Sequence, residues 1–169
     1  MEKFNIFWFR RDLRLQDNTG LYNALTAGLK VQPLFIFDKN ILSELPSSDR
    51  RVDFIHQALA QIHNELAEMQ ACLQIEYGDP KEVFASLIRE GRLHAVYTNN
   101  DYEPYALQRD QDIAQLLTGS QIEFYSFKDQ VIFEKNEVVK DDGLPYTVFT
   151  PYSKKWKALL KDQHLQAFQ

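Results

Sequence analysis

Apolar runs of strand length alternate with amphipathic helical segments through the first three quarters of the chain. Strands are expected at residues 6–9, 31–37, 73–77, 94–98 and 122–125, and helices at 21–29, 50–70, 81–90 and 104–117. The run at 31–37 is almost wholly apolar, which is typical of a strand covered on both faces. Helices between consecutive strands are the connections that parallel strands need. The pattern therefore predicts an α/β fold, a Rossmann-like doubly wound five-stranded parallel sheet in the order 3-2-1-4-5 with helices on both faces.

The last forty residues do not continue this rhythm. Two short extended runs at 131–133 and 137–139 predict a hairpin or an extended pair, residues 141–143 (D-D-G) a turn, and residues 153–161 a helix. The sequence then stops at Gln169 without a closing element, so we expect more chain to follow in the natural protein. We therefore divide it into an α/β domain at 1–130 and a tail at 131–169 that begins a linker.

Composition excludes several classes of function. The formal net charge of -5 makes DNA binding by this piece alone unexpected, because phosphate contacts require a basic surplus. A single cysteine, Cys72, excludes a disulfide framework and is expected to be a buried, inert thiol in a reducing cytosol. No apolar run has membrane-spanning length, and the N-terminus enters a strand without a signal peptide. The expected location is cytoplasmic, with no membrane partner.

Familiar catalytic and nucleotide motifs are missing. No G-x-G-x-x-G follows the first strand, and the sequence contains no G-x-x-x-x-G-K-[ST]. The four histidines lack metal-ligand spacing, and no Ser-His-Asp or Cys-His set is indicated. The sequence favours a binding crevice over a hydrolytic site.

Polar residues gather after the first, second and fourth expected strands. The first is followed by residues 10–18 (R-R-D-L-R-L-Q-D-N), the second by Asp38, and the fourth by residues 99–104 (N-N-D-Y-E-P). Ligands of open parallel sheets bind beyond the carboxyl ends of the strands, where the strand order reverses. Plainer interpretations remain open: residues 17–19 and the acids at 101 and 103 are also suited to cap helices, and the arginines to pair with those acids on a solvated face.

Residues 8–18 (W-F-R-R-D-L-R-L-Q-D-N) resemble the opening signature of the DNA photolyase/cryptochrome family. Later segments resemble further family motifs in the right order: F-I-F-D at 35–38, R-x-x-F-x-x-x-x-L at 51–59, G-D-P at 78–80, N-N-D-Y-E-P-Y-A-L-Q-R-D at 99–110 and G-L-P-Y-T-V-F-T-P-Y at 143–152. The resemblance covers essentially the whole chain.

This resemblance implies the N-terminal domain of a deoxyribodipyrimidine photolyase, which repairs cyclobutane pyrimidine dimers with light. A cryptochrome-type blue-light receptor is the alternative. In the family, a C-terminal helical domain holds FAD and receives the flipped-out lesion. Damaged DNA is thus an expected partner of the full-length enzyme, a carbon-carbon lyase, while this fragment alone is expected to be inactive. The oligomeric state is left open.

The α/β domain of the family holds a light-harvesting antenna: methenyltetrahydrofolate, 8-hydroxy-5-deazaflavin or FMN. The resemblance and the strand-end positions together imply six antenna-binding residues in this chain. Phe35 and Phe37 would contact a planar ring, Arg11 an anionic or carbonyl edge of it. Asp38, Asp101 and Glu103 complete the set, the last two as acceptors for ring N–H groups. The choice among the three antennas stays open.

Overall fold

A computed structural model describes residues 2–168. Its sheet has five strands, β1 (Phe4–Phe9), β2 (Val31–Asp38), β3 (Gln74–Gly78), β4 (Leu93–Asn99) and β5 (Glu123–Phe127). The spatial order is β3-β2-β1-β4-β5, and every neighbouring pair is parallel. The predicted sheet and strand order are confirmed.

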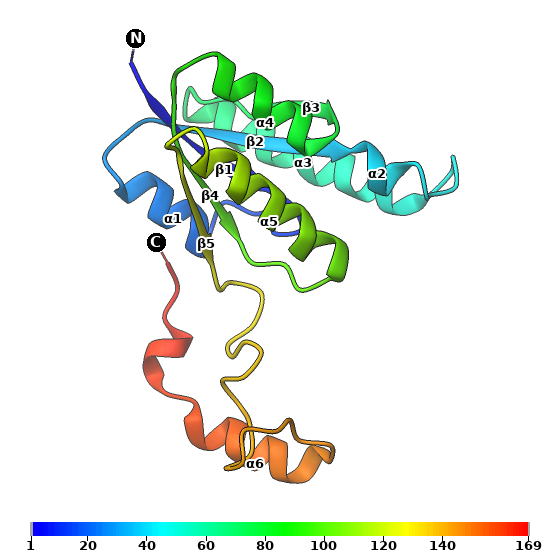
Figure 1. The fold of residues 1–169 in the computed structure, drawn as a ribbon, viewed down its shortest axis with the longest axis vertical. Helices are drawn as coiled ribbons and strands as arrows, with labels where there is room; N and C mark the ends of the chain where they lie inside the picture. The colour runs from blue at the N-terminus through cyan, green and yellow to red at the C-terminus, as the bar shows by residue number, and fades with distance from the viewer. Residues whose placement is uncertain (1, 169) are drawn as a thin grey trace.

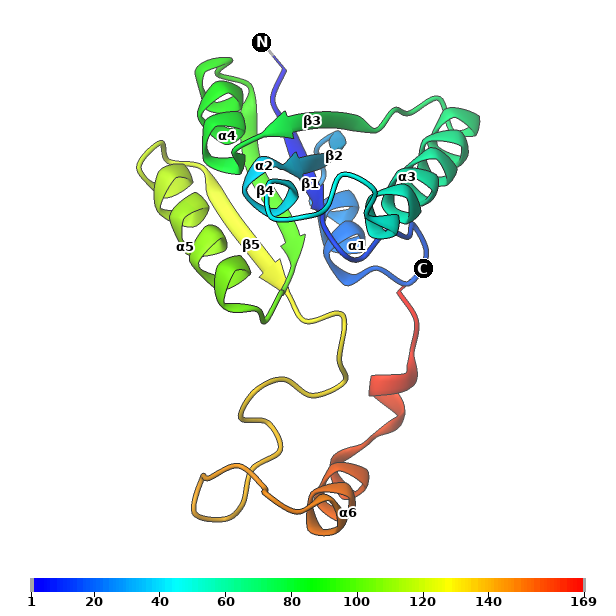
Figure 2. The same cartoon turned by 90° about the vertical axis from the view of Figure 1, so that its right-hand side faces the viewer.

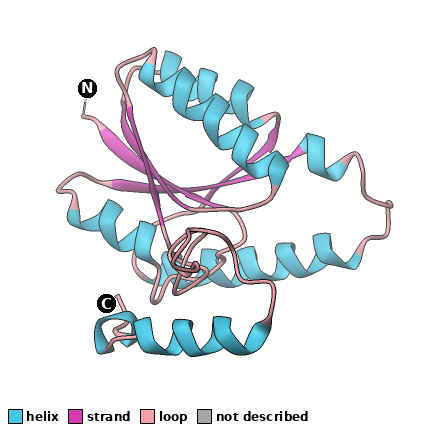
Figure 3. Cartoon of the chain, turned by 60° about the horizontal axis from the view of Figure 1, so that its bottom comes forward, coloured by secondary structure: helices cyan, strands magenta, loops and turns pink. Residues whose placement is uncertain are grey.

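Helices cover both faces of this sheet, which lies between two helical layers (Figures 1 and 3). One face packs against α4 (Pro80–Arg89) and α5 (Pro104–Thr118) through a core that includes Trp8, Val96 and Ile113. The other face packs against α1 (Thr19–Thr26) and α3 (Arg50–Glu68) through a core of Phe7, Phe9, Leu59 and other residues. Alternate residues of β1 serve opposite cores because side chains of a strand alternate between its faces.

The helix starts follow from capping side chains. Asn18, one of the caps considered from the sequence, accepts a hydrogen bond from the backbone N–H of Leu21 at α1, and Asp49 accepts one from Arg51 at α3. Glu103 occupies the N-cap position of α5 but makes no side-chain capping bond. A short helix that the sequence did not predict, α2 (Lys39–Leu42), starts directly after β2 because Asp38 caps it.

Gly20 allows α1 to lie very close to the sheet. A Cβ at this position would sit 2.7 Å from Oδ1 of Asn99 and 2.8 Å from the Phe7 ring. Its backbone N–H donates to Asn99 Oδ1 at 2.8 Å. A glycine is therefore required where α1 crosses the ends of β1 and β4.

The hairpin predicted at 131–139 is wrong: this segment contains no strand. Local side-chain bonds replace a cross-strand ladder. The carboxylate of Glu137 accepts from the backbone N–H of Glu134 and from the ammonium of Lys128, which holds the chain in a turn. Glu134 in turn accepts from Asn100 and Tyr102, both at 2.6 Å, and so ties the turn to the segment after β4.

The tail extends away from the sheet and then returns toward it (Figures 1 and 2). Its helix α6 (Phe149–Leu159) starts four residues before the predicted position, and the 3₁₀ turn η1 (Asp162–Leu165) follows. Near the end, the Phe168 backbone N–H donates to Asp17, and its ring lies 5.3 Å from that of Tyr22. In the described part of the chain, no helix is long and apolar enough to cross a membrane.

Cys72 is exposed, contrary to the expectation of a buried thiol. It lies in the loop between α3 and the edge strand β3, where the neighbouring Leu73 is the residue that packs inward. An apolar run does not by itself say which of two adjacent side chains faces the core.

Candidate functional site

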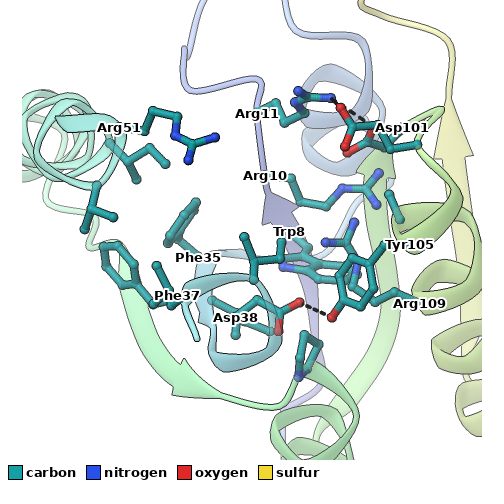
Figure 4. A pocket seen from close by; sticks show the side chains of 18 of the residues that line it. Trp8, Arg10, Arg11, Phe35, Phe37, Asp38, Arg51, Asp101, Tyr105 and Arg109 are labelled. Carbon is teal, nitrogen blue, oxygen red and sulfur yellow. Dashed lines mark hydrogen bonds and ion pairs between the residues drawn. The ribbon is translucent and has the colours of Figure 1, made fainter. Parts of the chain in front are cut away.

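A cavity of about 350 Å³ opens beyond the carboxyl ends of β1 and β2. Its other walls come from α2, the first turn of α3, and the segment from β4 into α5 (Figure 4). This volume lies at the lower end of the range for small-molecule sites. All six residues singled out from the sequence line this one cavity: Arg11, Phe35, Phe37, Asp38, Asp101 and Glu103.

One wall is aromatic and aliphatic. Phe35 and Phe37 project from the same face of β2, with ring centroids 5.0 Å apart in an edge-to-face arrangement. Phe35 is buried and Phe37 is half-buried. Side chains from the start of α3, Val52 and Ile55, line the cavity as well. The arrangement offers apolar contact area to a flat ring system.

Arg11 pairs with the two acids that follow β4. Its Nη1 lies 3.0 Å from Glu103 and 3.4 Å from Asp101. Burial alone would lower the pKa of Arg11, but the two carboxylates outweigh it and raise that pKa. The ion pairing considered from the sequence is thus present, at the rim of the cavity. Arg11 is still half exposed, and its guanidinium has more N–H donors than those of the one nitrogen that pairs with the two acids.

Asp38 is committed to bonds within the protein. Its Oδ2 accepts from the Tyr105 hydroxyl at 2.6 Å, and its Oδ1 accepts from the Asn40 backbone N–H at 3.0 Å. Burial, and then the bond to Asp38, raise the pKa of Tyr105 to about 12. Asp38 therefore fixes α2 and Tyr105 in place, which leaves it fewer free acceptor positions than the sequence implied.

The cavity is also lined by residues outside these six, among them Trp8, Arg10, Tyr105 and Arg109. Tyr105 and Arg109 lie four residues apart on α5, on one face of the helix, and this spacing within the motif at 99–110 was the available signal. Arg109 lies over the Trp8 ring, with its Cζ 4.9 Å from the ring centroid. Burial and the nearby Arg10 both lower the pKa of Arg109.

Much of the opening motif supports the fold and lies outside the cavity. The buried Asn99 side chain donates to Asp12 at 2.6 Å and to Asn18 at 2.8 Å, and accepts from the Gly20 backbone. Arg14 pairs with Asp129 at 2.8 Å. The Asn99 bonds join the loop after β1 to the end of β4 and so hold Arg11 opposite its two acids. The Arg14 pair joins the same loop to the segment after β5.

No group of three or more metal-ligating side chains occurs within residues 2–168. The cavity instead combines an apolar wall, buried aromatic rings and charged groups at its rim. Flat, conjugated molecules with polar edges fit such a lining, because rings pack on the apolar wall while arginine and carboxylate groups meet the polar edge.

Comparison with known proteins assigns the chain to a family. The family model described as DNA photolyase matches residues 5–169. A deoxyribodipyrimidine photo-lyase of Synechococcus sp. is 32% identical over 90% of this chain and 32% of its own length. Cryptochromes are among the other relatives.

Solved structures show the same fold. A bacterial class III photolyase from Agrobacterium tumefaciens superposes with a TM-score of 0.81 at 31% identity, over 94% of this chain and 32% of that one. An archaeal photolyase from Sulfolobus tokodaii gives a TM-score of 0.79 at 29% identity, over 92% and 35% of the two chains. Its structure was solved with two FAD molecules and described as implying a novel light-harvesting cofactor.

The chain spans about a third of the length of the photolyases that it matches. Over that span the strand order, the motifs and the superposition all agree. The chain therefore belongs to the DNA photolyase family.

Proposed function

We propose that this chain is the N-terminal part of a deoxyribodipyrimidine photolyase and that its cavity binds a light-harvesting chromophore. The observation that carries the proposal is the single cavity at the carboxyl ends of β1 and β2, lined by all six residues expected from the family motifs. The solved relative with a second FAD supports an antenna in this part of the family.

Each lining group has a role in the proposed complex. The chromophore ring packs against Phe35 and Phe37. Arg11 donates to a carbonyl or anionic edge of the chromophore, and Asp101 and Glu103 accept from its N–H groups. Asp38 acts through Tyr105, which it holds at the cavity wall. Methenyltetrahydrofolate, 8-hydroxy-5-deazaflavin and FMN all meet these requirements.

The photochemistry itself belongs to a part beyond this chain. We propose that residues 131–169 lead to a helical domain that holds FAD and binds damaged DNA, in a cytoplasmic enzyme. Exposed apolar side chains on the tail, Leu144, Val148 and Phe149 among them, support a covering partner there. This chain has a net charge of -5, which is unfavourable for contacts with DNA phosphates, and so supports DNA binding by that other part.

By itself this chain is expected to leave dimer-containing DNA unrepaired under near-UV light. Light-driven repair after addition of the helical domain would distinguish a photolyase from a cryptochrome-type receptor.

Chromophore retention tests the cavity directly. The purified chain is incubated with each of the three chromophores, separated from free pigment, and examined by absorbance. Retention of one of them is expected. Arg11→Gln removes a charged donor from the rim and should weaken binding about tenfold, which corresponds to a charged hydrogen bond of about 1.5 kcal/mol.

Arg92→Gln is the matched control. Arg92 is also about half exposed and paired with an acid, but it lies before β4, at the opposite end of the sheet. This variant should bind like the wild type. If none of the three chromophores is retained, by this chain or by the chain joined to a helical domain, the antenna proposal is wrong.

A further inference from the structure

Trp8 places an electron-rich ring at the inner end of the cavity. Its indole is 2% exposed and forms part of the cavity wall. The excited state of a flavin-like ring is a strong one-electron oxidant, and an indole at contact distance is a good donor. Transfer of one electron would give an indole radical cation and a chromophore radical anion, which recombine to the ground state. The excitation would then be lost as heat before it could be passed on.

Two guanidinium groups lie over this indole. The Cζ of Arg109 is 4.9 Å from the Trp8 ring centroid, and that of Arg10 is 5.2 Å away. Both side chains are buried, 10% and 6% exposed. Arg109 also lies 5.8 Å from the ring of Tyr105, the other oxidisable aromatic side chain of this wall. A cation over an aromatic face attracts the electrons of that ring, so removing one of them becomes harder.

Two carboxylates lie near these guanidinium groups. Asp110 pairs with both Arg10 and Arg109, so one carboxylate faces two guanidinium groups. Asp38 bonds to Tyr105 and to neither arginine, but its charge also acts on Arg109. The guanidinium groups nevertheless remain the charged groups that lie over the Trp8 ring. An indole radical cation formed here would carry a like charge about 5 Å from Arg109 in a poorly solvated setting, which is unfavourable.

We propose that Arg109, together with Arg10, keeps Trp8 from quenching the excited chromophore and so preserves its energy for transfer. The inference rests on the proposed chromophore site. It makes Arg109 a residue that acts through Trp8 and not by contact with the reacting FAD. A purely structural role, in which Arg109 only holds α5 against β1, predicts changes in stability but none in the excited-state lifetime.

The lifetime of the bound chromophore tests this proposal. Time-resolved fluorescence is recorded on the chain loaded with whichever of the three chromophores it retains. Arg109→Met keeps an unbranched stem over the indole but removes the charge. It should shorten the lifetime several-fold, because it removes a cation 4.9 Å from the indole centroid and so makes loss of an electron from that ring easier. Arg109→Lys, which keeps the charge, should restore most of the lifetime.

Removing the donor should rescue the variant. Trp8→Phe in the Arg109→Met background is expected to return the lifetime to the wild-type value, while Trp8→Phe alone should change it little. Arg92→Met is the matched control, because the Cζ of Arg92 lies 5.3 Å over the Phe4 ring at the far end of β1. Its lifetime should equal that of the wild type.

Several results would overturn the proposal. An unchanged lifetime in Arg109→Met with chromophore still bound would refute the inference and leave the chromophore site intact. A several-fold longer lifetime in Trp8→Phe alone would show that Trp8 already quenches in the wild type, and this measurement holds even where Arg109→Met does not fold. If Tyr105→Phe restored the lifetime and Trp8→Phe did not, the electron donor would be Tyr105, and the proposed role of Trp8 would be wrong. Retention of no chromophore would refute the site and the inference together.

Discussion

Asn99→Ala should lower the free energy of unfolding strongly, although it removes only one small side chain. It lies at the end of β4 and is 2% exposed. Its amide nitrogen donates to the carboxylate of Asp12 at 2.6 Å and to Asn18 at 2.8 Å, and its oxygen accepts from the Gly20 backbone at 2.8 Å. Asn99→Ala removes all three bonds at once.

The expected loss follows from what is left behind. The bond to Asp12 involves a buried charge, and such bonds contribute about 1.5–3 kcal/mol each. The bonds to Asn18 and Gly20 join neutral groups and contribute about 1 kcal/mol each. In this variant the Asp12 carboxylate would still accept from the backbone N–H of Arg10 at 2.9 Å and weakly from Asn18 at 3.4 Å, so it would not lose all its partners. We expect the free energy of unfolding to fall by about 3–5 kcal/mol.

Urea denaturation followed by circular dichroism measures this loss. The midpoint should fall with no change in slope, and the melting temperature should drop by about 2–4 °C per kcal/mol for a chain of this size. A double-mutant cycle with Asp12→Ala should show that the two losses are not additive. A loss below about 1 kcal/mol in Asn99→Ala would refute the view that this network holds the loop after β1 to β4.

Two further predictions concern single side chains. Asn5 is fully buried in β1, and both polar atoms of its side chain lack hydrogen-bond partners within residues 2–168. Asn5→Val should therefore raise the free energy of unfolding, measured by urea denaturation, by about 1–3 kcal/mol. A loss of stability would show that the Asn5 side chain is not unsatisfied. Tyr105 should titrate near pH 12 by phenolate absorbance, and Asp38→Asn should lower that pKa while leaving it above its ordinary value, because burial is the larger cause. Folding favours the protonated phenol of Tyr105, because its pKa is higher in the folded chain than in the unfolded one. This contribution to stability is present below the ordinary pKa of about 10 and is lost as pH rises toward 12. The stability of Tyr105→Phe should lack this pH dependence.

Local patterns were sufficient for the architecture. The alternation of apolar strands with amphipathic helices predicts the parallel sheet, its strand order and the edge at which the cavity opens. These features depend on side-chain periodicity within short segments and on the rule that parallel strands carry helical crossovers. A capping role for Asn18 was among those considered for the same reason, since a cap bonds to a backbone N–H only two or three residues away.

The six candidate residues were identified from the family resemblance together with the rule that the carboxyl ends of parallel strands meet at one edge. Their partners were not, because those partners come from distant parts of the chain. Asp38 bonds to Tyr105 across 67 residues, and Arg10 pairs with Asp110 across 100. Local sequence is likewise a poor guide at 131–139, where two extended runs predict a hairpin and the side chain of Glu137 closes a turn instead.

The sequence by itself thus determined that the ends of β1, β2 and β4 meet at one edge, because topology brings these strand ends together whatever the side chains do. Only the tertiary structure decided the state of each residue there. It shows that Asp38 is already hydrogen-bonded, that Arg11 is shared between two acids, and that Trp8 lies beneath two guanidinium groups. Charge and polarity at a site depend on contacts between elements that pack side by side, and sequence spacing carries no measure of those distances.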